Sequence, residues 1–158
     1  MKKLLLAGLF TFSLVGCATT PDQPQDTMQE TIRYSSSPCF GACPIYSVEV
    51  SPYGAVHFDG KQYTKVIGTQ DLTVDPSVYK KLQQELKTYR PETGANVKTT
   101  GCVQTATDQP SAYFWWKRPD GTVTRLSHYQ GCISPANAEL NKLIEKLPTL
   151  IGIEDLVR

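Results

Sequence analysis

Hydrophobic and polar residues alternate along two parts of the chain, and a period of two is typical of β-strands that bury one face. Between residues 31 and 67 the alternating stretches follow one another across short turns, which predicts an antiparallel meander. Between residues 112 and 129 two stretches flank a Pro-Asp-Gly turn, which predicts a hairpin. The expected strands cover residues 31–35, 45–50, 55–59, 62–67, 112–117 and 122–129.

Two further segments carry apolar residues at helical spacing, and each begins with a capping residue followed by proline. The first begins at Asp75-Pro76 and is expected to end before Pro91. The second begins at Ser134-Pro135, and Pro148 is expected to stop it. Residues 91–110 are polar, show no period and are expected to be irregular. Strands followed by a helix, twice over, predict an α+β fold in which two helices pack on one face of an antiparallel sheet.

The N-terminus has the zones of an export signal. Lys2 and Lys3 precede a charge-free apolar run over residues 4–15, which is shorter than the roughly 20 residues of a spanning helix. The run closes on Gly16-Cys17, which resembles the bacterial lipobox. That resemblance implies a signal peptide over residues 1–16, cleavage before Cys17, and a lipid on its thiol and new amine that would anchor the protein in a membrane.

The residues after Cys17 bear on location. Residues 17–29 are polar with two prolines, and we expect the lipidated cysteine and a flexible tether there, followed by a single domain over residues 30–158. Ala18 stands where an aspartate would be the usual signal for retention in the inner membrane. The lipobox resemblance therefore favours a lipid anchor in the outer membrane, with the domain facing the periplasm.

Composition narrows the possible functions. The 158 residues suit one domain, and removing Lys2 and Lys3 with the signal leaves 14 basic against 15 acidic residues. Such a balance argues against a nucleic-acid partner bound through a broad basic field. With His57 and His128 as its two histidines, the chain also lacks the composition of a His-rich metal site.

Besides Cys17 there are four cysteines, Cys39, Cys43, Cys102 and Cys132. In an exported protein an even number argues for disulfides, here with three possible connectivities. We favour Cys39–Cys43 and Cys102–Cys132, because the flanks of a hairpin lie close together. Under this interpretation both bridges are structural and the protein holds no metal or cofactor.

A sharper alternative rests on Cys39, Cys43 and Pro44. Their spacing is similar to the Cys-x-x-x-Cys-Pro of thioredoxin-like copper chaperones, which implies copper bound by two thiolates with His128 as a distant third ligand. However, residues 45–50 alternate as a strand rather than open a helix. In addition, no Lys, Arg or His stands within five residues of either cysteine to stabilise a thiolate. Copper binding or thiol–disulfide exchange therefore stays the second hypothesis.

Residues 38–60 carry Cys-Phe-Gly-x-Cys-Pro-x-Tyr, a strand, Gly-x-Val and a second strand that ends in glycine. This motif resembles a family of bacterial lipoprotein domains of unknown function (domain of unknown function 6438), and the likeness extends over nearly all of residues 30–158. It implies export and a small α+β domain, with no assigned activity. Physically, the motif suits a corner in which Gly41 and Pro44 set the backbone and Phe40 packs beneath.

Aromatic residues point to a binding surface. Residues 113–116, Tyr-Phe-Trp-Trp, place aromatic rings on both faces of one strand. One face is expected to fill the core, and the other, with Tyr113, Trp115 and Tyr129, is a possible surface for an envelope protein or a glycan. His57 with Asp59, and His128 with Asp108, are possible acid–base pairs.

No nucleophile motif accompanies these pairs, so no catalytic residue is predicted. The sequence therefore predicts a lipid-anchored periplasmic domain that works as a non-enzymatic binding or structural module of the cell envelope.

Overall fold

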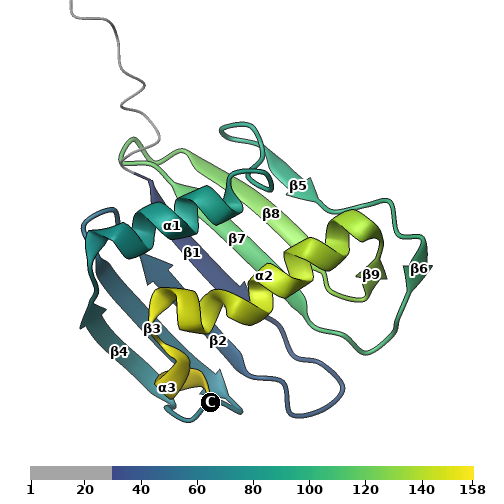
Figure 1. Cartoon of the computed structure of the whole chain (residues 1–158), viewed down its shortest axis with the longest axis horizontal. Helices are drawn as coiled ribbons and strands as arrows, with labels where there is room; N and C mark the ends of the chain where they lie inside the picture. The colour runs from purple at the N-terminus through teal and green to yellow at the C-terminus, as the bar shows by residue number, and fades with distance from the viewer. Residues whose placement is uncertain (1–29) are drawn as a thin grey trace, which may run out of the picture.

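The computed structural model describes residues 30–158, which form a large sheet, a small sheet and three helices (Figure 1). The strands are β1 (Thr31–Ser36), β2 (Ile45–Val50), β3 (Ala55–Gln62), β4 (Gly68–Thr73), β5 (Asn96–Lys98), β6 (Gln104–Thr105), β7 (Ser111–Lys117), β8 (Val123–Tyr129) and β9 (Cys132–Ile133). The helices are α1 (Pro76–Leu86), α2 (Pro135–Ile151) and α3 (Glu154–Val157).

The large sheet has seven strands in the order β4-β3-β2-β1-β7-β8-β5. The meander β1 to β4 and the hairpin β7–β8 form as the alternation predicts, and the hairpin joins the meander along β1. The first strand of the domain is therefore the central one. Six residue pairs link it to β7 and four link it to β2, all antiparallel.

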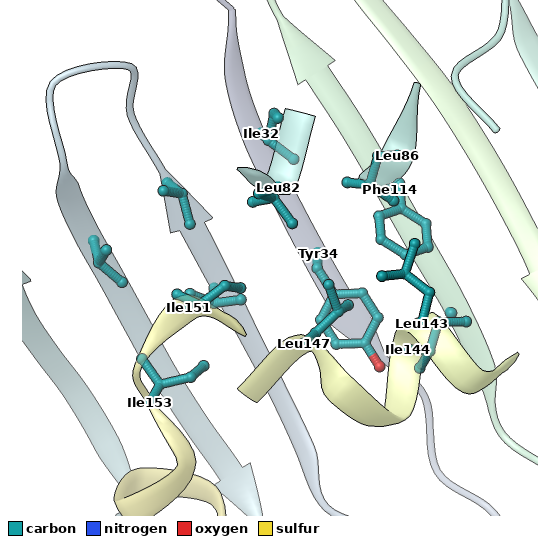
Figure 2. Packing of buried hydrophobic residues seen from close by; sticks show 14 of the residues in the cluster. Ile32, Tyr34, Leu82, Leu86, Phe114, Leu143, Ile144, Leu147, Ile151 and Ile153 are labelled. Atoms are coloured by element: carbon teal, nitrogen blue, oxygen red, sulfur yellow. The ribbon is translucent and has the colours of Figure 1, made fainter. Parts of the chain in front are cut away.

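One face of this sheet carries the hydrophobic core. Figure 1 shows α1 and α2 crossing the same face, and Figure 2 shows Ile32, Tyr34 and Phe114 of the strands beside helix residues. Leu86 and Leu147 are each fully buried in this cluster. Because successive strand residues point to opposite faces, the alternation seen in the sequence separates this core from the other side of the sheet.

The two long helices begin where the sequence predicts. Asp75 accepts a hydrogen bond from the backbone N–H of Ser77 at 2.8 Å, and Ser134 accepts one from Asn137 at 3.2 Å. The expectation that Pro148 stops the second helix is wrong, because α2 continues to Ile151. Gly152 ends it instead, in the left-handed conformation at φ 83°.

The other differences lie in segments without a period. Residues 91–110, expected to be irregular, contain β5, which pairs in parallel with β8, and β6, which pairs with β9. The expected strand over 62–67 is displaced: β3 runs on to Gln62 and β4 begins at Gly68. The helix α3 was not predicted. These elements are two to six residues long, too short for periodicity to reveal.

A buried ion pair holds the start of the domain. Glu30 is fully buried, and its carboxylate accepts hydrogen bonds from the Arg90 guanidinium, one of them from Nε at 3.0 Å. The Tyr79 hydroxyl donates to the Glu30 backbone carbonyl. The residue before β1 is thus fixed to α1 and to the loop that follows it.

Candidate functional site

The face of the large sheet turned away from α1 and α2 is open, and its charges are divided between two halves. In β1, β7, β8 and β5 the outward residues include four cations and, within these strands, no acid. We call this area the basic half. Its cations are Arg33, Lys98, Lys117 and Arg125.

Trp115 lies at the centre of the basic half. It stands opposite Arg33 of β1 on one side and opposite Arg125 of β8 on the other. The Arg33 guanidinium carbon lies 5.6 Å from the centre of the Trp115 ring, a cation–π contact. One N–H of Arg33 also reaches the hydroxyl of Ser47 at 3.4 Å. The Arg33 side chain is therefore held in place from two sides.

A groove of about 420 Å³ follows this row of side chains across four strands. Trp115 and Val123 give it an apolar lining, and Glu49 is its one acid. The cations Arg33, Lys117 and Arg125 line it as well. A groove that is cationic and partly apolar is suited to an anionic ligand with some flat or apolar surface.

The structure brings together two of the three aromatic residues predicted as a binding surface. Tyr113 and Trp115 are half-buried neighbours on β7, with ring centres 6.0 Å apart. Tyr129 lies on the same face, but its hydroxyl donates to the Ala106 carbonyl at 2.7 Å. Its ring also covers Gly131, where an added Cβ would lie 2.6 Å from a ring carbon. Tyr129 therefore has a structural role, since it ties the end of β8 to the segment around Ala106 that precedes β7.

The opposite half of the open face is acidic. There the strands β2, β3 and β4 carry Glu49, Asp59 and Asp71. His57 Nδ1 lies 2.6 Å from Asp71, and Lys61 lies 2.5 Å from Asp59. His57 and Asp59 share this face as predicted, but they do not pair with each other: His57 pairs with Asp71 of β4, and Asp59 pairs with Lys61 two residues further along β3.

The first cysteine pair closes a corner between β1 and β2. Cys39 is bonded to Cys43, and both are half-exposed. The Ser36 hydroxyl donates to the Pro44 carbonyl at 2.7 Å and accepts from the Tyr46 N–H at 3.2 Å, which fixes the entrance to β2.

The expectation that Phe40 packs beneath this corner is wrong, because its side chain is 88% exposed. The loop extends beyond the ends of β1 and β2 (Figure 1), so the ring has no sheet to cover. A hydrogen bond from the Phe40 N–H to the Asp108 carbonyl, at 3.1 Å, ties the loop to the segment before β7.

The second pair joins Cys102 to Cys132 across the hairpin, and both pairs favoured from the sequence are thus bonded in the structure. Cys132 is buried, and the amide of Asn137 donates to its backbone carbonyl at 2.9 Å. This bridge therefore fastens the long segment after β5 to the start of α2.

His128 is buried on the core side of β8, away from the first cysteine pair. Its Nε2 lies 2.7 Å from Asn141 Oδ1, and its Nδ1 lies 2.9 Å from the Thr99 hydroxyl. Because the Asn141 amide nitrogen donates elsewhere, to Gln130, its Oδ1 is the atom that faces the ring, and Nε2 of His128 donates to it. Burial lowers the pKa of His128.

Within residues 30–158 no three His, Cys, Asp or Glu side chains gather closely enough to hold a metal ion. Cys39, Cys43 and His128 therefore do not form one cluster, and the predicted pairing of His128 with Asp108 does not form either. Asp108 instead accepts from the neighbouring Thr107 hydroxyl. Cys17 lies outside the described residues, and none of the helices described is long and apolar enough to cross a membrane.

These features define a disulfide-bonded α+β domain with one face of its sheet filled by a core and the other open. The model of a family described as a domain of unknown function (DUF6438) matches residues 30–151, and the chain belongs to that family. A search of the curated proteins gives no significant match. The charge division of the open face escaped sequence reasoning, because its cations come from four strands that only the tertiary register brings together.

Proposed function

We propose that this protein is a non-enzymatic binding module of the cell envelope, anchored by a lipid on Cys17 and facing the periplasm from the outer membrane. Its binding surface is the basic half of the open face. The observation that carries the proposal is the position of Trp115. This large aromatic side chain is half-buried between two arginines on the side of the sheet that does not pack against the helices.

The arrangement of charge supports binding over a purely structural role. Arg33, Lys117 and Arg125 line one groove that has a single acid, Glu49, so positive charge accumulates there. No two of these cations stand directly opposite each other in the strand register, but like charges this close still repel one another weakly. On a surface that binds nothing, we expect acidic residues between the basic ones, as in β3, where Asp59 pairs with Lys61. An anionic partner removes that repulsion.

The groove lies close to the point where the tether from Cys17 joins the domain. Thr31, the first residue of β1, also lines the groove, so the chain enters the domain beside the binding surface. Twelve residues separate Cys17 from Glu30, and at about 3.3 Å per residue they reach at most about 40 Å. A partner would therefore be held close to the membrane.

Two experiments test the proposal on the full-length protein. Metabolic labelling with palmitate, followed by membrane fractionation, should show labelled protein in the outer membrane for the wild type and none for Cys17→Ser. Co-sedimentation of the detergent-solubilised protein with detergent-extracted envelopes, which offer the anchor no bilayer, should be lost in the Arg33→Gln, Arg125→Gln double variant. Retained sedimentation of that variant would rule out the basic half as the binding surface.

The second candidate function is thiol–disulfide exchange at Cys39–Cys43. One observation favours it: both sulfur-bearing residues are half-exposed at the rim, where a thiol can approach. Copper binding at the same residues has less support, since both ring nitrogens of His128 are engaged with Asn141 and Thr99.

Alkylation followed by intact mass measurement distinguishes a structural bridge from a reactive one. A structural pair stays closed in mild reductant, whereas a redox site opens while Cys102–Cys132 stays bonded. Metal analysis of the same samples should find copper above background if the alternative is correct.

A further inference from the structure

We propose that the ligand of the basic half is an acidic glycan, a linear carbohydrate with carboxylates on repeated sugars. This inference rests on the proposed function and specifies the chemistry of its partner. It is drawn from the spacing of the cations, the way Arg33 is held, the polar groups around Trp115, and the acids on the other half of the face.

The spacing indicates a ligand with more than one negative charge. Arg33 and Arg125 stand on β1 and β8, with Trp115 of β7 between them in one row. Neighbouring strands lie about 4.8 Å apart, so the two arginine backbones are separated by about 10 Å. A single carboxylate could engage both arginines only if their side chains came together over Trp115, whereas a chain with charges at intervals can pair with each arginine where it stands.

The arginine side chain of β1 is prepared for such a contact. Arg33 lies over the Trp115 ring, and Ser47 accepts from one of its five N–H donors. The remaining donors are free to form a forked contact with a carboxylate, and less side-chain entropy is lost because the guanidinium is already positioned.

The surroundings suit sugars. Hydroxyl-bearing residues stand among the cations and aromatic rings of the basic half, where they can exchange hydrogen bonds with the hydroxyls of a carbohydrate. Tyr113 and Trp115 supply flat apolar surface on the same strand. The hydroxyl-bearing residues are Thr31, Ser35, Ser111 and Ser127.

An acidic peptide fits less well. An extended peptide gains most of its affinity by adding a strand to the edge of a sheet. The groove lies on the face of the sheet, over β1 and β7, whose backbones are paired on both sides. A peptide bound there would have to leave its own backbone groups to water.

A lipid bilayer fits less well too, because it is planar and would meet the whole open face. Pressing that face onto anionic headgroups would bring Glu49, Asp59 and Asp71 against negative charge. A narrow chain can follow the basic half and avoid them.

The test uses the full-length protein in a non-ionic detergent and follows tryptophan fluorescence, which reports on Trp115 against the buried Trp116. The probes are oligogalacturonate as the acidic glycan, a neutral maltooligosaccharide, poly-glutamate of equal charge, and vesicles of phosphatidylglycerol and phosphatidylethanolamine. We expect saturable binding of oligogalacturonate that weakens with added salt and exceeds binding of the other three probes.

Matched variants locate the site. Arg33→Gln with Arg125→Gln should weaken oligogalacturonate binding by about tenfold or more, because two charge-assisted contacts are lost. Lys80→Gln with Lys81→Gln removes the same charge from the exposed side of α1 and should change affinity by less than about twofold. Trp115→Phe keeps the fold and should weaken binding while it removes the fluorescence response. Circular dichroism confirms that each variant is folded.

The failures are distinguishable from those of the proposed function. If the protein sediments with envelopes but does not bind oligogalacturonate, or binds poly-glutamate or the vesicles equally well, the glycan inference is wrong and the binding module survives. If oligogalacturonate binds equally to the arginine double variant and the lysine control, binding is non-specific and the inference is overturned. Loss of envelope binding by the wild type itself would overturn both.

Discussion

The two faces of the large sheet are built from the same strands but are used in opposite ways. Trp115 and Trp116 are consecutive in β7, yet Trp116 is 1% exposed in the core while Trp115 lines an open groove among cations. On the core side, every buried side-chain nitrogen and oxygen within residues 30–158 has a hydrogen-bond partner. His128, for example, is bonded through both ring nitrogens. On the basic half, three cations line one groove with a single acid, Glu49.

The difference shows on which face the choice of amino acid is constrained by folding and on which face it is not. Burial against α1 and α2 determines which residues are tolerated inside, because packing and hydrogen bonding must both be satisfied there. On the open face a strand needs only a side chain that suits the sheet, so its composition can follow a ligand. The charge division of that face is the part of the molecule least explained by folding.

The largest expected effect compares the two neighbouring tryptophans. Trp116→Ala should lower the free energy of unfolding by about 3–5 kcal/mol, since it leaves a large cavity in the core. Trp115→Ala should lower it by less than about 1 kcal/mol, because the site is open to solvent. Urea unfolding followed by circular dichroism measures both. Equal losses would show that the open face contributes to stability as the core does.

The two disulfides extend the comparison to the ends of the sheet. Removing Cys102–Cys132 by a double serine substitution should cost about 3–4 kcal/mol, because it closes a long loop. Removing Cys39–Cys43, whose residues are four apart, should cost about 2 kcal/mol. Thermal unfolding of the two variants gives the order. A larger loss at Cys39–Cys43 would mean that the corner contributes more than its short loop predicts.

Some parts of the fold can be predicted from the sequence and others cannot, and the difference is whether they depend on local patterns or on tertiary contacts. Local patterns predict where the two long helices begin, at Asp75 and Ser134, and where the paired strands lie. Capping residues and alternation can both be recognised from residues that are close in sequence. The end of α2 is also local, because Gly152 is a C-cap residue directly after the last helical position, and Pro148 is the weaker stop signal of the two. The parallel pairing of β5 to β8 depends on tertiary contacts, because three exposed residues carry no periodic signal.

The sequence predicts only the aromatic part of the candidate site, because only that part depends on a local pattern. Tyr113 and Trp115 were recognisable because a run of aromatic residues in a strand must place some of them outside. The arginines that flank Trp115 come from residues 33 and 125, and only the strand register shows that they meet it. Register between distant strands is set by the whole fold, so no local pattern reveals it.

A third comparison sets a buried ion pair against one on the open face. Arg90→Ala should destabilise the protein by about 2–3 kcal/mol, because the Glu30 carboxylate stays buried without its partner. Lys61→Ala breaks the pair with Asp59, in which the lysine is 62% exposed, and should cost less than about 0.5 kcal/mol. Chemical unfolding at moderate salt checks both. A comparable loss for Lys61→Ala would contradict the contrast.

The smallest expected effect is a pH dependence from the core side. Burial lowers the pKa of His128 in the folded protein, while the unfolded chain takes up its proton near pH 6.5. The contribution of the neutral imidazole is thus fully present above pH 6.5 and is lost as the pH falls toward the folded pKa. The loss has a slope of at most about 1.4 kcal/mol per pH unit. Unfolding measured from pH 7.5 to 5.5 should show this slope, and His128→Gln should flatten it.

The central position of β1 has a mechanical consequence. A pull on the chain ahead of Glu30 enters the sheet through its middle strand, which is flanked on both sides by antiparallel ladders. Because ladder hydrogen bonds run perpendicular to the strands, a load along β1 shears many of them together instead of opening them one after another. The domain is thus built to resist tension from its N-terminal side better than it would if an edge strand came first.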